Sequence, residues 1–265
     1  MKYIKSSSHE LRDMFENSIS VNTISEKLIC CSPGDNALEV RERMSIDDFD
    51  VLGVYENNQV SGYIEKENLE AGHCKDYQKI FHPPQLIANS TPLIDILPIL
   101  KENNWIFVLE KNHVTSIVTR ADLQKAPVRM LLFGQITLLE MNIQRIIESF
   151  YEHDAWQQYI WSERLENART LFAKRKRRNE AISLLDCIQF CDKICLVVRS
   201  PELCEKLSIL DKAEKQRVGA IEDLRNRIAH AQDIVTGSSW EEVIDLTEFL
   251  GLLLQRCEEV GTFRK

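Results

Sequence analysis

The sequence has no apolar run long enough to cross a membrane. Its longest run, around Phe249 to Leu254, falls far short of the roughly 20 residues that a spanning helix needs. The first 18 residues carry no apolar core after their lysines, which predicts that they form no secretory signal. These two absences predict a cytoplasmic protein that makes no use of a membrane.

Cysteine occurs at an ordinary level and in no informative spacing. None of the eight cysteines is spaced as in a disulfide framework or a zinc site. Cys30 and Cys31 are adjacent, and Cys187, Cys191 and Cys195 are four residues apart. The pattern indicates reduced thiols, and we expect no metal site and no required cofactor.

Positive charge is in deficit. The chain has 33 Lys and Arg against 41 Asp and Glu, a net charge of −8. This balance excludes a protein that coats nucleic acid or membrane with its whole surface, although it allows a local basic patch. The deficit is uneven, because residues 1–124 have 12 cations against 19 anions and residues 125–265 have 21 against 22. With 44% apolar and 28% charged residues, the chain can still bury a packed core.

The first half contains an internal repeat. Val51 to Leu69 aligns without a gap to Trp105 to Leu123, at an offset of 54 residues. Each copy has two short apolar runs around a polar turn that holds Asn58 or Asn112, a residue type that tolerates the left-handed backbone of a tight hairpin.

Helical patterns surround each hairpin. One precedes the first copy at residues 37–44 and another precedes the second at residues 93–101. A further helix start follows each hairpin, at Asn68 or Asp122. The sequence therefore predicts two α-β-β-α units, each too small to bury both faces of its sheet alone, which pack against each other.

This repeat resembles a pair of CBS domains (a Bateman module). The family signature is a glycine, two apolar residues, Thr or Ser, two variable residues and then Asp. The second copy carries most of it from Ser116 to Asp122, with Ser116 in place of the glycine. The first copy keeps Gly62 but has Glu65 at the Thr position and Asn68 at the Asp position. The resemblance implies an α+β CBS pair over residues 1–125, with repeats at about 20–70 and 85–125.

The second copy has the chemistry of an adenosine-type site. Asp122, at a helix start, can accept the two hydroxyls of a ribose, and Thr119 offers a hydroxyl to a sugar or phosphate beside a helix N-terminus. Ser116 and Arg120 complete this candidate nucleotide site. Glu65 would instead place a carboxylate where an anionic ligand needs a donor, so we expect one competent site at most. The alternative is that Thr119 and Asp122 only cap the helix.

After Pro127 the sequence has helical periodicity throughout. Helices are predicted at about 130–150, 154–173, 179–198, 211–232 and 239–259. Breaks are predicted at Ser200-Pro201 and at Gly237 to Ser239. Ser239 and Glu242 form a capping box for the last helix. We therefore expect an all-α bundle of four or five helices over residues 126–265.

The fourth of these helices carries Arg225, Asn226 and His230. Asn226 and His230 are four residues apart and share a helix face. The motif resembles that of the HEPN family (higher eukaryote and prokaryote nucleotide-binding domains), whose ribonuclease members have Arg, four to six residues and then His. Arg225, Asn226 and His230 match this motif residue for residue.

The resemblance implies metal-independent RNA cleavage that yields a 2′,3′-cyclic phosphate. His230 would act as general acid or base, Arg225 would hold the charged phosphate, and Asn226 would orient His230 or the phosphate. The family's design implies a homodimer, or a larger even-numbered oligomer. DNA, which lacks the 2′-hydroxyl, would not be cut. The alternative is that Arg225 pairs with an acid such as Glu222 and that His230 caps the helix.

A basic cluster of Lys174, Arg175, Lys176, Arg177 and Arg178 is expected between two helices, where it would contact RNA phosphates or simply be solvated. The aromatics just before it favour core packing over base stacking. They are Trp156, Tyr159 and Trp161.

Two functions remain open at this point. The first is an adenine-nucleotide-regulated endoribonuclease, with a toxin-like or defence-like role. The second is a non-catalytic HEPN-like module for dimerisation or partner docking, joined to a CBS pair that senses a nucleotide or serves as a scaffold.

Overall fold

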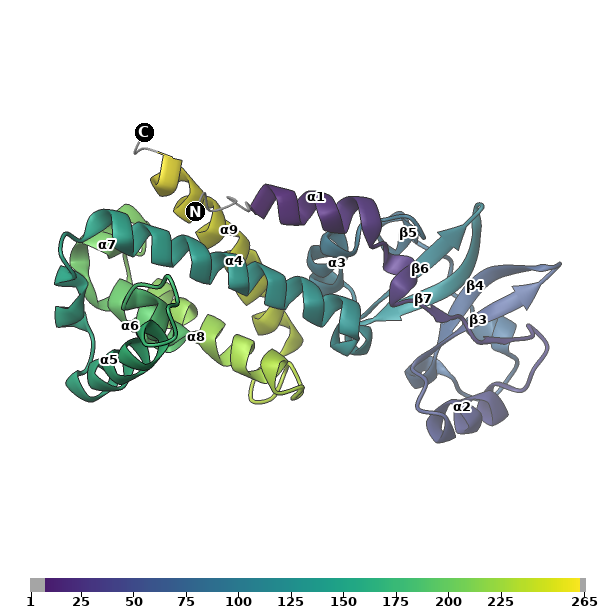
Figure 1. The fold of residues 1–265 in the computed structure, drawn as a ribbon. Helices are drawn as coiled ribbons and strands as arrows, with labels where there is room; N and C mark the ends of the chain where they lie inside the picture. The colour runs from purple at the N-terminus through teal and green to yellow at the C-terminus, as the bar shows by residue number, and fades with distance from the viewer. Residues whose placement is uncertain (1–7, 263–265) are drawn as a thin grey trace. The chain divides into compact units, whose positions relative to one another are not determined.

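The computed structural model describes residues 8–262 of the chain. Residues 1–7, which include the lysines of the segment tested for a secretory signal, lie outside the described residues. The chain divides into two compact units (Figure 1). One is formed by residues 14–128, and the other by residues 129–262 together with residues 8–13.

The N-terminal unit is built from two hairpins with short helices. Helix α1 spans Ser8–Ser18, and its last residues belong to this unit. The elements of the first half are β1 (Glu26–Lys27), β2 (Cys30–Cys31), α2 (Ala37–Ile46), β3 (Val51–Glu56) and β4 (Gln59–Glu65). Those of the second half are β5 (Leu86–Ala88), α3 (Ile96–Glu102), β6 (Trp105–Glu110) and β7 (His113–Thr119).

Both hairpins turn as the asparagines predict. Asn57 and Asn58 have φ of 52° and 62°, and Lys111 and Asn112 have φ of 48° and 67°. Two consecutive left-handed residues make the mirror-image turn that suits the twist of paired strands. Each hairpin also has one irregularity in register, after Val54 in the first and after Val108 in the second, again 54 residues apart.

The two copies form two sheets that share a core. One sheet has the order β1-β7-β6-β5 and the other β2-β3-β4. Strand β1 precedes the first hairpin in sequence but pairs antiparallel with β7 of the second, with Glu26 opposite Ile117. The shared core consists of Leu28, Val51, Tyr63, Phe107 and Val114. The predicted packing of the two repeats of the N-terminal unit against each other is confirmed.

The short helices differ in detail from the prediction. The helix expected at 93–101 begins as a 3-10 turn at Leu93–Asp95 and becomes α-helical only in α3. The segments after the hairpins are 3-10 turns, at Lys66–Asn68 and at Arg120–Gln124. Thr119 is the N-cap of the second turn, and Asp122 is therefore its third residue and not its start.

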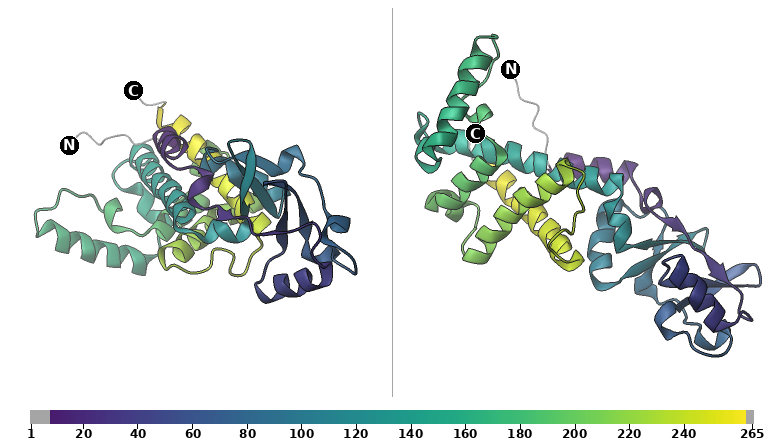
Figure 2. Two further views of the ribbon diagram at one scale, coloured as in Figure 1. Left: turned by 90° about the vertical axis from the view of Figure 1, so that its right-hand side faces the viewer. Right: turned by 90° about the horizontal axis from the view of Figure 1, so that it is seen from below.

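The second unit is helical, as predicted (Figure 2). Its α-helices are α4 (Ala126–Phe150), α5 (Ser162–Lys176), α6 (Phe190–Arg199), α7 (Pro201–Lys206), α8 (Lys212–Ala229) and α9 (Trp240–Thr262). The α+β class of the first part and the α class of the second are both confirmed. None of the helices among residues 8–262 is long and apolar enough for a bilayer crossing.

Two predicted helices are shorter than expected. The one at 154–173 begins with a 3-10 turn, Ala155–Tyr159, before α5. The one at 179–198 is helical only from α6 onward, apart from the 3-10 turn Leu185–Cys187. The break at Ser200 proves to be the cap of α7, because the Ser200 hydroxyl accepts the Leu203 N–H at 3.2 Å and proline suits a first helical position.

The buried stripe of α8 is the one expected from its sequence. Val218, Ile221, Leu224 and Ile228 are all buried. The helix packs against α6 and α9. Because this stripe fixes the rotation of α8, it also decides which of the polar residues near the end of the helix face solvent.

Candidate functional site

The N-terminal unit has a cavity of about 480 Å³ between its two copies. Thr119, Arg120 and Asp122 lie in its wall, but Ser116 does not. The first copy contributes residues before β2 and between α2 and β3, while the second contributes the start of β6 and the end of β7. The remaining lining residues are Glu26, Lys27, Leu28, Ile29, Asp48, Phe49, Asp50, Val51, Asn104, Trp105, Ile117 and Ala121.

Thr119 and Asp122 are bonded to each other. The Asp122 Oδ2 atom accepts the Thr119 N–H at 2.7 Å and the Thr119 hydroxyl at 3.0 Å. The Asp122 Oδ1 atom lies 2.8 Å from Lys125 Nζ. Asp122 is buried, with 9% of its side chain exposed. Thr119 and Asp122 therefore do cap the 3-10 turn, as the alternative states. The cap does not use every acceptor position of the Asp122 carboxylate.

The remaining capacity of Asp122 can be counted. A carboxylate offers about four acceptor positions, and Thr119 and Lys125 take three of them. One position is left for a ligand hydroxyl. Accepting two ribose hydroxyls would require Thr119 or Lys125 to give up a bond.

Lys125 is a site residue that the sequence did not reveal. Besides Asp122, it binds Glu26 and donates to the Ile24 carbonyl at 2.6 Å. Burial alone lowers the pKa of Lys125, but hydrogen bonds to Asp122 and Glu26 outweigh it and raise the pKa above its ordinary value. Its charge is thus held beside the cavity, where it offsets those of the two carboxylates.

Arg120 lines the cavity but is bonded to backbone carbonyls of α3. Its Nε donates to the Leu100 carbonyl at 2.8 Å and its Nη2 to the Lys101 carbonyl at 2.8 Å. These carbonyls belong to the last turn of α3, where a cation is favoured by the helix dipole. Arg120 therefore bonds the end of α3 to the cavity wall. What it offers to the cavity is its positive charge more than an unbonded N–H group.

The rest of the lining includes two exposed apolar side chains and Trp105. Ile29 and Phe49 are exposed by 44% and 37%. The Trp105 Nε1 atom is buried and has no hydrogen-bond acceptor among the described residues. A buried N–H without an acceptor costs about 1–3 kcal/mol.

The equivalent position in the first copy is occupied by the chain itself. The Glu65 Oε2 atom binds Lys79 Nζ at 2.6 Å and the Asn68 amide at 2.7 Å. The hydrogen bond that Lys79 donates to Glu65 raises the pKa of Lys79. Glu65 and Asn68 thus satisfy each other and Lys79.

Arg225, Asn226 and His230 lie at the C-terminal end of α8. Arg225 and Asn226 are half-buried, and the Arg225 Nη1 donates to Asn226 Oδ1 at 3.1 Å. His230 is exposed and is the C-cap residue, one position beyond the helix. Within residues 8–262, Arg225 has no carboxylate at ion-pair distance and the His230 ring has no hydrogen-bond partner. The predicted alternative pairing of Arg225 with Glu222 is therefore absent from the described residues.

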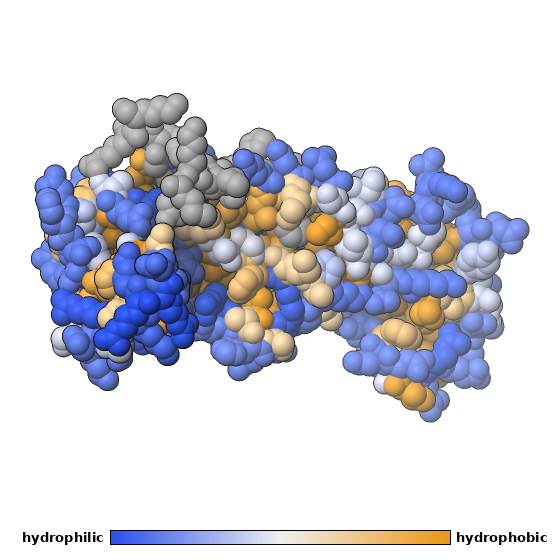
Figure 3. All heavy atoms as spheres, viewed as in Figure 1, coloured by the Kyte–Doolittle hydropathy of each residue, from blue (hydrophilic) through white to orange (hydrophobic). Residues whose placement is uncertain are grey.

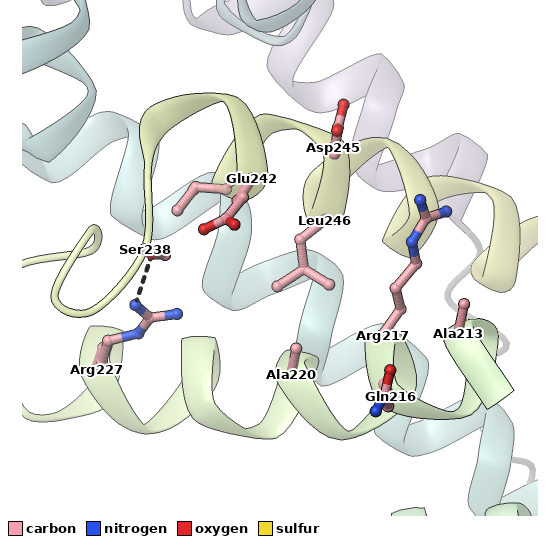
Figure 4. Close-up of a pocket in the computed structure, with 10 residues that line it drawn as sticks. Ala213, Gln216, Arg217, Ala220, Arg227, Ser238, Glu242, Asp245 and Leu246 are labelled. Carbon is pink, nitrogen blue, oxygen red and sulfur yellow. Dashed lines mark hydrogen bonds between the residues drawn. The ribbon is translucent and has the colours of Figure 1, made fainter.

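A second cavity, of about 380 Å³, lies between α8 and α9 (Figure 4). Arg227 points into this region and donates to Ser238 Oγ at 3.2 Å and to the Thr236 carbonyl at 2.9 Å. Those bonds hold the loop that follows His230. Arg225, Asn226 and His230 do not line this cavity.

The basic cluster is not an interhelical loop. Lys174, Arg175 and Lys176 form the last turn of α5, where the helix dipole favours cations. Arg175 is paired with Glu180 at 2.6 Å. Arg177 and Arg178 follow the helix and are exposed, as are Lys174 and Lys176.

The three aromatics before α5 have different surroundings. Trp156 is buried, as predicted, and its Nε1 donates to Asp154 at 3.2 Å. Tyr159 is half-buried, with its hydroxyl 3.4 Å from Glu202. Trp161 is 61% exposed, so the prediction of core packing is wrong for this residue. It follows the end of a 3-10 turn as the N-cap of α5, and its backbone is not helical.

Solved structures of CBS-domain proteins are similar to part of this chain. The protein CBSX2 from Arabidopsis thaliana is 17% identical, with 42% of this chain and 95% of that chain covered and a TM-score of 0.37. CBSX2 in complex with AMP is 16% identical, covering 42% and 97%, with a TM-score of 0.37. The CBS domain of a bacterial CNNM/CorC family Mg²⁺ transporter in complex with ATP is 16% identical, covering 42% and 87%, with a TM-score of 0.33. No family model and no curated protein sequence matches this chain.

Proposed function

We propose that the N-terminal unit is a CBS pair that binds one adenosine-type nucleotide in the cavity beside Thr119 and Asp122. The observation that carries this proposal is the cavity itself, which lies between the two copies and has three of the four predicted residues in its wall. The signature residues of the second copy and the paired hairpins support the same reading. The nucleotide is a regulatory ligand and not a cofactor.

Different residues of the lining suit different parts of a nucleotide. Ile29 and Phe49 provide an apolar surface for the base, and the Trp105 side chain adds to it. Asp122 accepts one ribose hydroxyl with its remaining position. Lys27, an exposed cation in the wall, faces the phosphate end.

Calorimetric titration with AMP and ATP tests this proposal. We expect one site per chain, weakened at least tenfold by Asp122→Ala, since a hydrogen bond to a charged group contributes about 1.5–3 kcal/mol. The matched control is Asn68→Ala, which changes the equivalent position of the first copy and should leave affinity unchanged. Two equal sites, or no binding of either nucleotide, would contradict the proposal.

We further propose that the helical unit cleaves RNA without a metal. The observation that favours this function is the state of the motif, with His230 exposed and Arg225 bonded to Asn226 and not to a carboxylate. A ribonuclease needs an imidazole that can reach solvent and a guanidinium whose charge is not already neutralised.

In this reaction the 2′-hydroxyl of the RNA attacks the adjacent phosphorus, and the 5′-oxygen leaves. The 2′-hydroxyl loses a proton and the leaving 5′-oxygen gains one; His230 transfers one of these protons and solvent water transfers the other. Arg225 stabilises the extra negative charge of the pentacoordinate phosphorus, and Asn226 holds the Arg225 side chain through their hydrogen bond. A homodimer would bring a second copy of the motif to the same RNA.

Incubation with RNA in EDTA tests the cleavage proposal. We expect 2′,3′-cyclic phosphate ends from the wild type, none from a DNA of the same sequence, and loss of product in His230→Ala and Arg225→Ala. His113→Ala, which changes an exposed histidine of the other unit, is the control. Intact RNA with the wild type would leave the helical unit as a dimerisation or docking module.

The regulatory part of the proposal concerns helix α4. This helix begins at Ala126, directly after Lys125, which is bonded to Asp122. A nucleotide that competes for Asp122 would act on the first turn of a helix that continues into the helical unit. Cleavage rates measured with and without AMP test this coupling, and equal rates would exclude it.

A further inference from the structure

The exposed Trp161 and the cations of α5 form a surface that suits single-stranded nucleic acid. An indole that is 61% exposed is unusual when Trp156, five residues earlier, is only 3% exposed. The Arg199 guanidinium lies over the Trp161 ring, 4.3 Å from its centre. Arg199 in turn donates to the Tyr159 carbonyl at 3.3 Å. The ring is therefore held in place at the surface by a cation on one face.

The charge along α5, from Trp161 to the end of the basic cluster, is strongly positive. Residues 161–178 contain seven Lys and Arg against two Glu, a net charge of +5 in a chain of −8. Lys174, Arg177 and Arg178 are exposed, and within residues 8–262 no carboxylate lies at ion-pair distance from them. The space-filling view shows strongly hydrophilic residues gathered on the α5 side of the helical unit (Figure 3). Such a surface attracts a polyanion and disfavours a basic protein partner.

The dimensions fit a short strand. Helix α5 has 15 residues, which is about 22 Å at the rise of an α-helix. A stacked strand has one phosphate per roughly 3.4 Å, so this length accommodates about six nucleotides. Trp161 lies at one end of the helix and the free cations at the other.

We propose that Trp161, backed by Arg199, stacks a base of single-stranded RNA whose phosphates lie along α5. This inference rests on the proposed RNA function and adds where and how the strand is held. Stacking requires an unpaired base, whereas the cations contact phosphates of any strand. The surface therefore selects single-stranded RNA over a duplex, without reading its sequence.

Fluorescence anisotropy with a labelled ten-nucleotide RNA tests the inference, in a His230→Ala background so that the RNA stays intact. Trp161→Ala should weaken binding about 5- to 150-fold, the range measured for loss of one base–aromatic stack, with the salt dependence unchanged. The triple change Lys174→Ala, Arg177→Ala and Arg178→Ala should instead lower the slope of log K against log salt by about 2. Tyr55→Ala, which removes an exposed aromatic of the other unit, should change neither.

The outcomes separate this inference from the proposed function. If the His230→Ala protein binds the strand and its Trp161→Ala variant binds it equally, the stacking inference is wrong and RNA binding stands. If the wild type binds no RNA, the RNA function fails and the inference falls with it. If Trp161→Ala alters only self-association in sedimentation velocity, the indole is a protein contact and the inference is overturned. Equal loss of affinity for a duplex would also overturn it.

Discussion

Gly62 allows the chain between the two copies to lie against β4. A Cβ at this position would lie 2.5 Å from the Lys79 carbonyl oxygen and 2.6 Å from Gln78 Nε2. Ordinary contacts begin at about 3.4 Å, so the segment would have to move by roughly 0.9 Å. That segment is bonded to β4 by two hydrogen bonds, Tyr63 N–H to Lys79 O at 3.0 Å and Lys79 N–H to Tyr63 O at 2.8 Å.

Gly62→Ala should therefore destabilise the first copy. Overpacking costs about 1–3 kcal/mol and each of the two lost hydrogen bonds about 0.5–1.5 kcal/mol, so the expected loss is about 2–6 kcal/mol. Amide hydrogen exchange followed by mass spectrometry reports stability locally. Peptides from β3 and β4 should exchange at least about 30-fold faster, since 1.4 kcal/mol corresponds to a factor of ten.

Gly219→Ala is the matched control. Gly219 lies in α8, and a Cβ there would meet nothing within 4 Å. Alanine should stabilise this helix by up to about 1 kcal/mol. If Gly62→Ala leaves exchange in β3 and β4 unchanged, the close approach of Lys79 is not what requires glycine, and the reasoning is refuted.

Three further outcomes are expected. Asn112→Ala should lower the unfolding free energy by about 1–2 kcal/mol because its φ is 67°, whereas Asn112→Gly should not, as urea unfolding would show. Burial raises the pKa of Cys31 to about 12, so iodoacetamide at pH 8 should not modify it until the protein unfolds. The stability that this neutral thiol contributes is complete below about pH 8.5, the pKa of an exposed thiol, and decreases as the pH rises toward 12. Arg175→Gln should change the melting temperature little, because its pair with Glu180 is one-third exposed on both sides and water and salt screen such pairs.

The hairpins were predictable because their signals are local. Alternating apolar residues and the turn residues Asn58 and Asn112 lie within one short segment, and the 54-residue offset repeats the pattern. Strand β1 was not predictable, because its two residues gain their partner, β7, only when the chain folds back over the 88 positions between Lys27 and Ser116. Helix α7 was missed because Ser200-Pro201 has the residues of a break and equally those of a helix start.

The candidate nucleotide site was predictable only where the signature names a residue. Thr119 and Asp122 were found in this way, and both line the cavity. Trp105 and Lys27 were not found, since each is an ordinary strand residue until the two copies come together. Lys125 could have been suspected from its position three residues after Asp122, which brings a cation within reach of the carboxylate in a tight helical turn.

The two copies differ in a way that one residue can explain. Gly62 lets Lys79 approach β4, and Lys79 then binds Glu65, so the copy that keeps the signature glycine has its site occupied by its own chain. In the second copy the equivalent residue is Ser116, which pairs with Lys27 of β1 and needs no such close approach. Lys125 binds Asp122 there, but the cavity beside Thr119 and Asp122 stays open. The departure from the signature in the second copy therefore coincides with the open cavity, and this asymmetry is why a single nucleotide site per chain is expected.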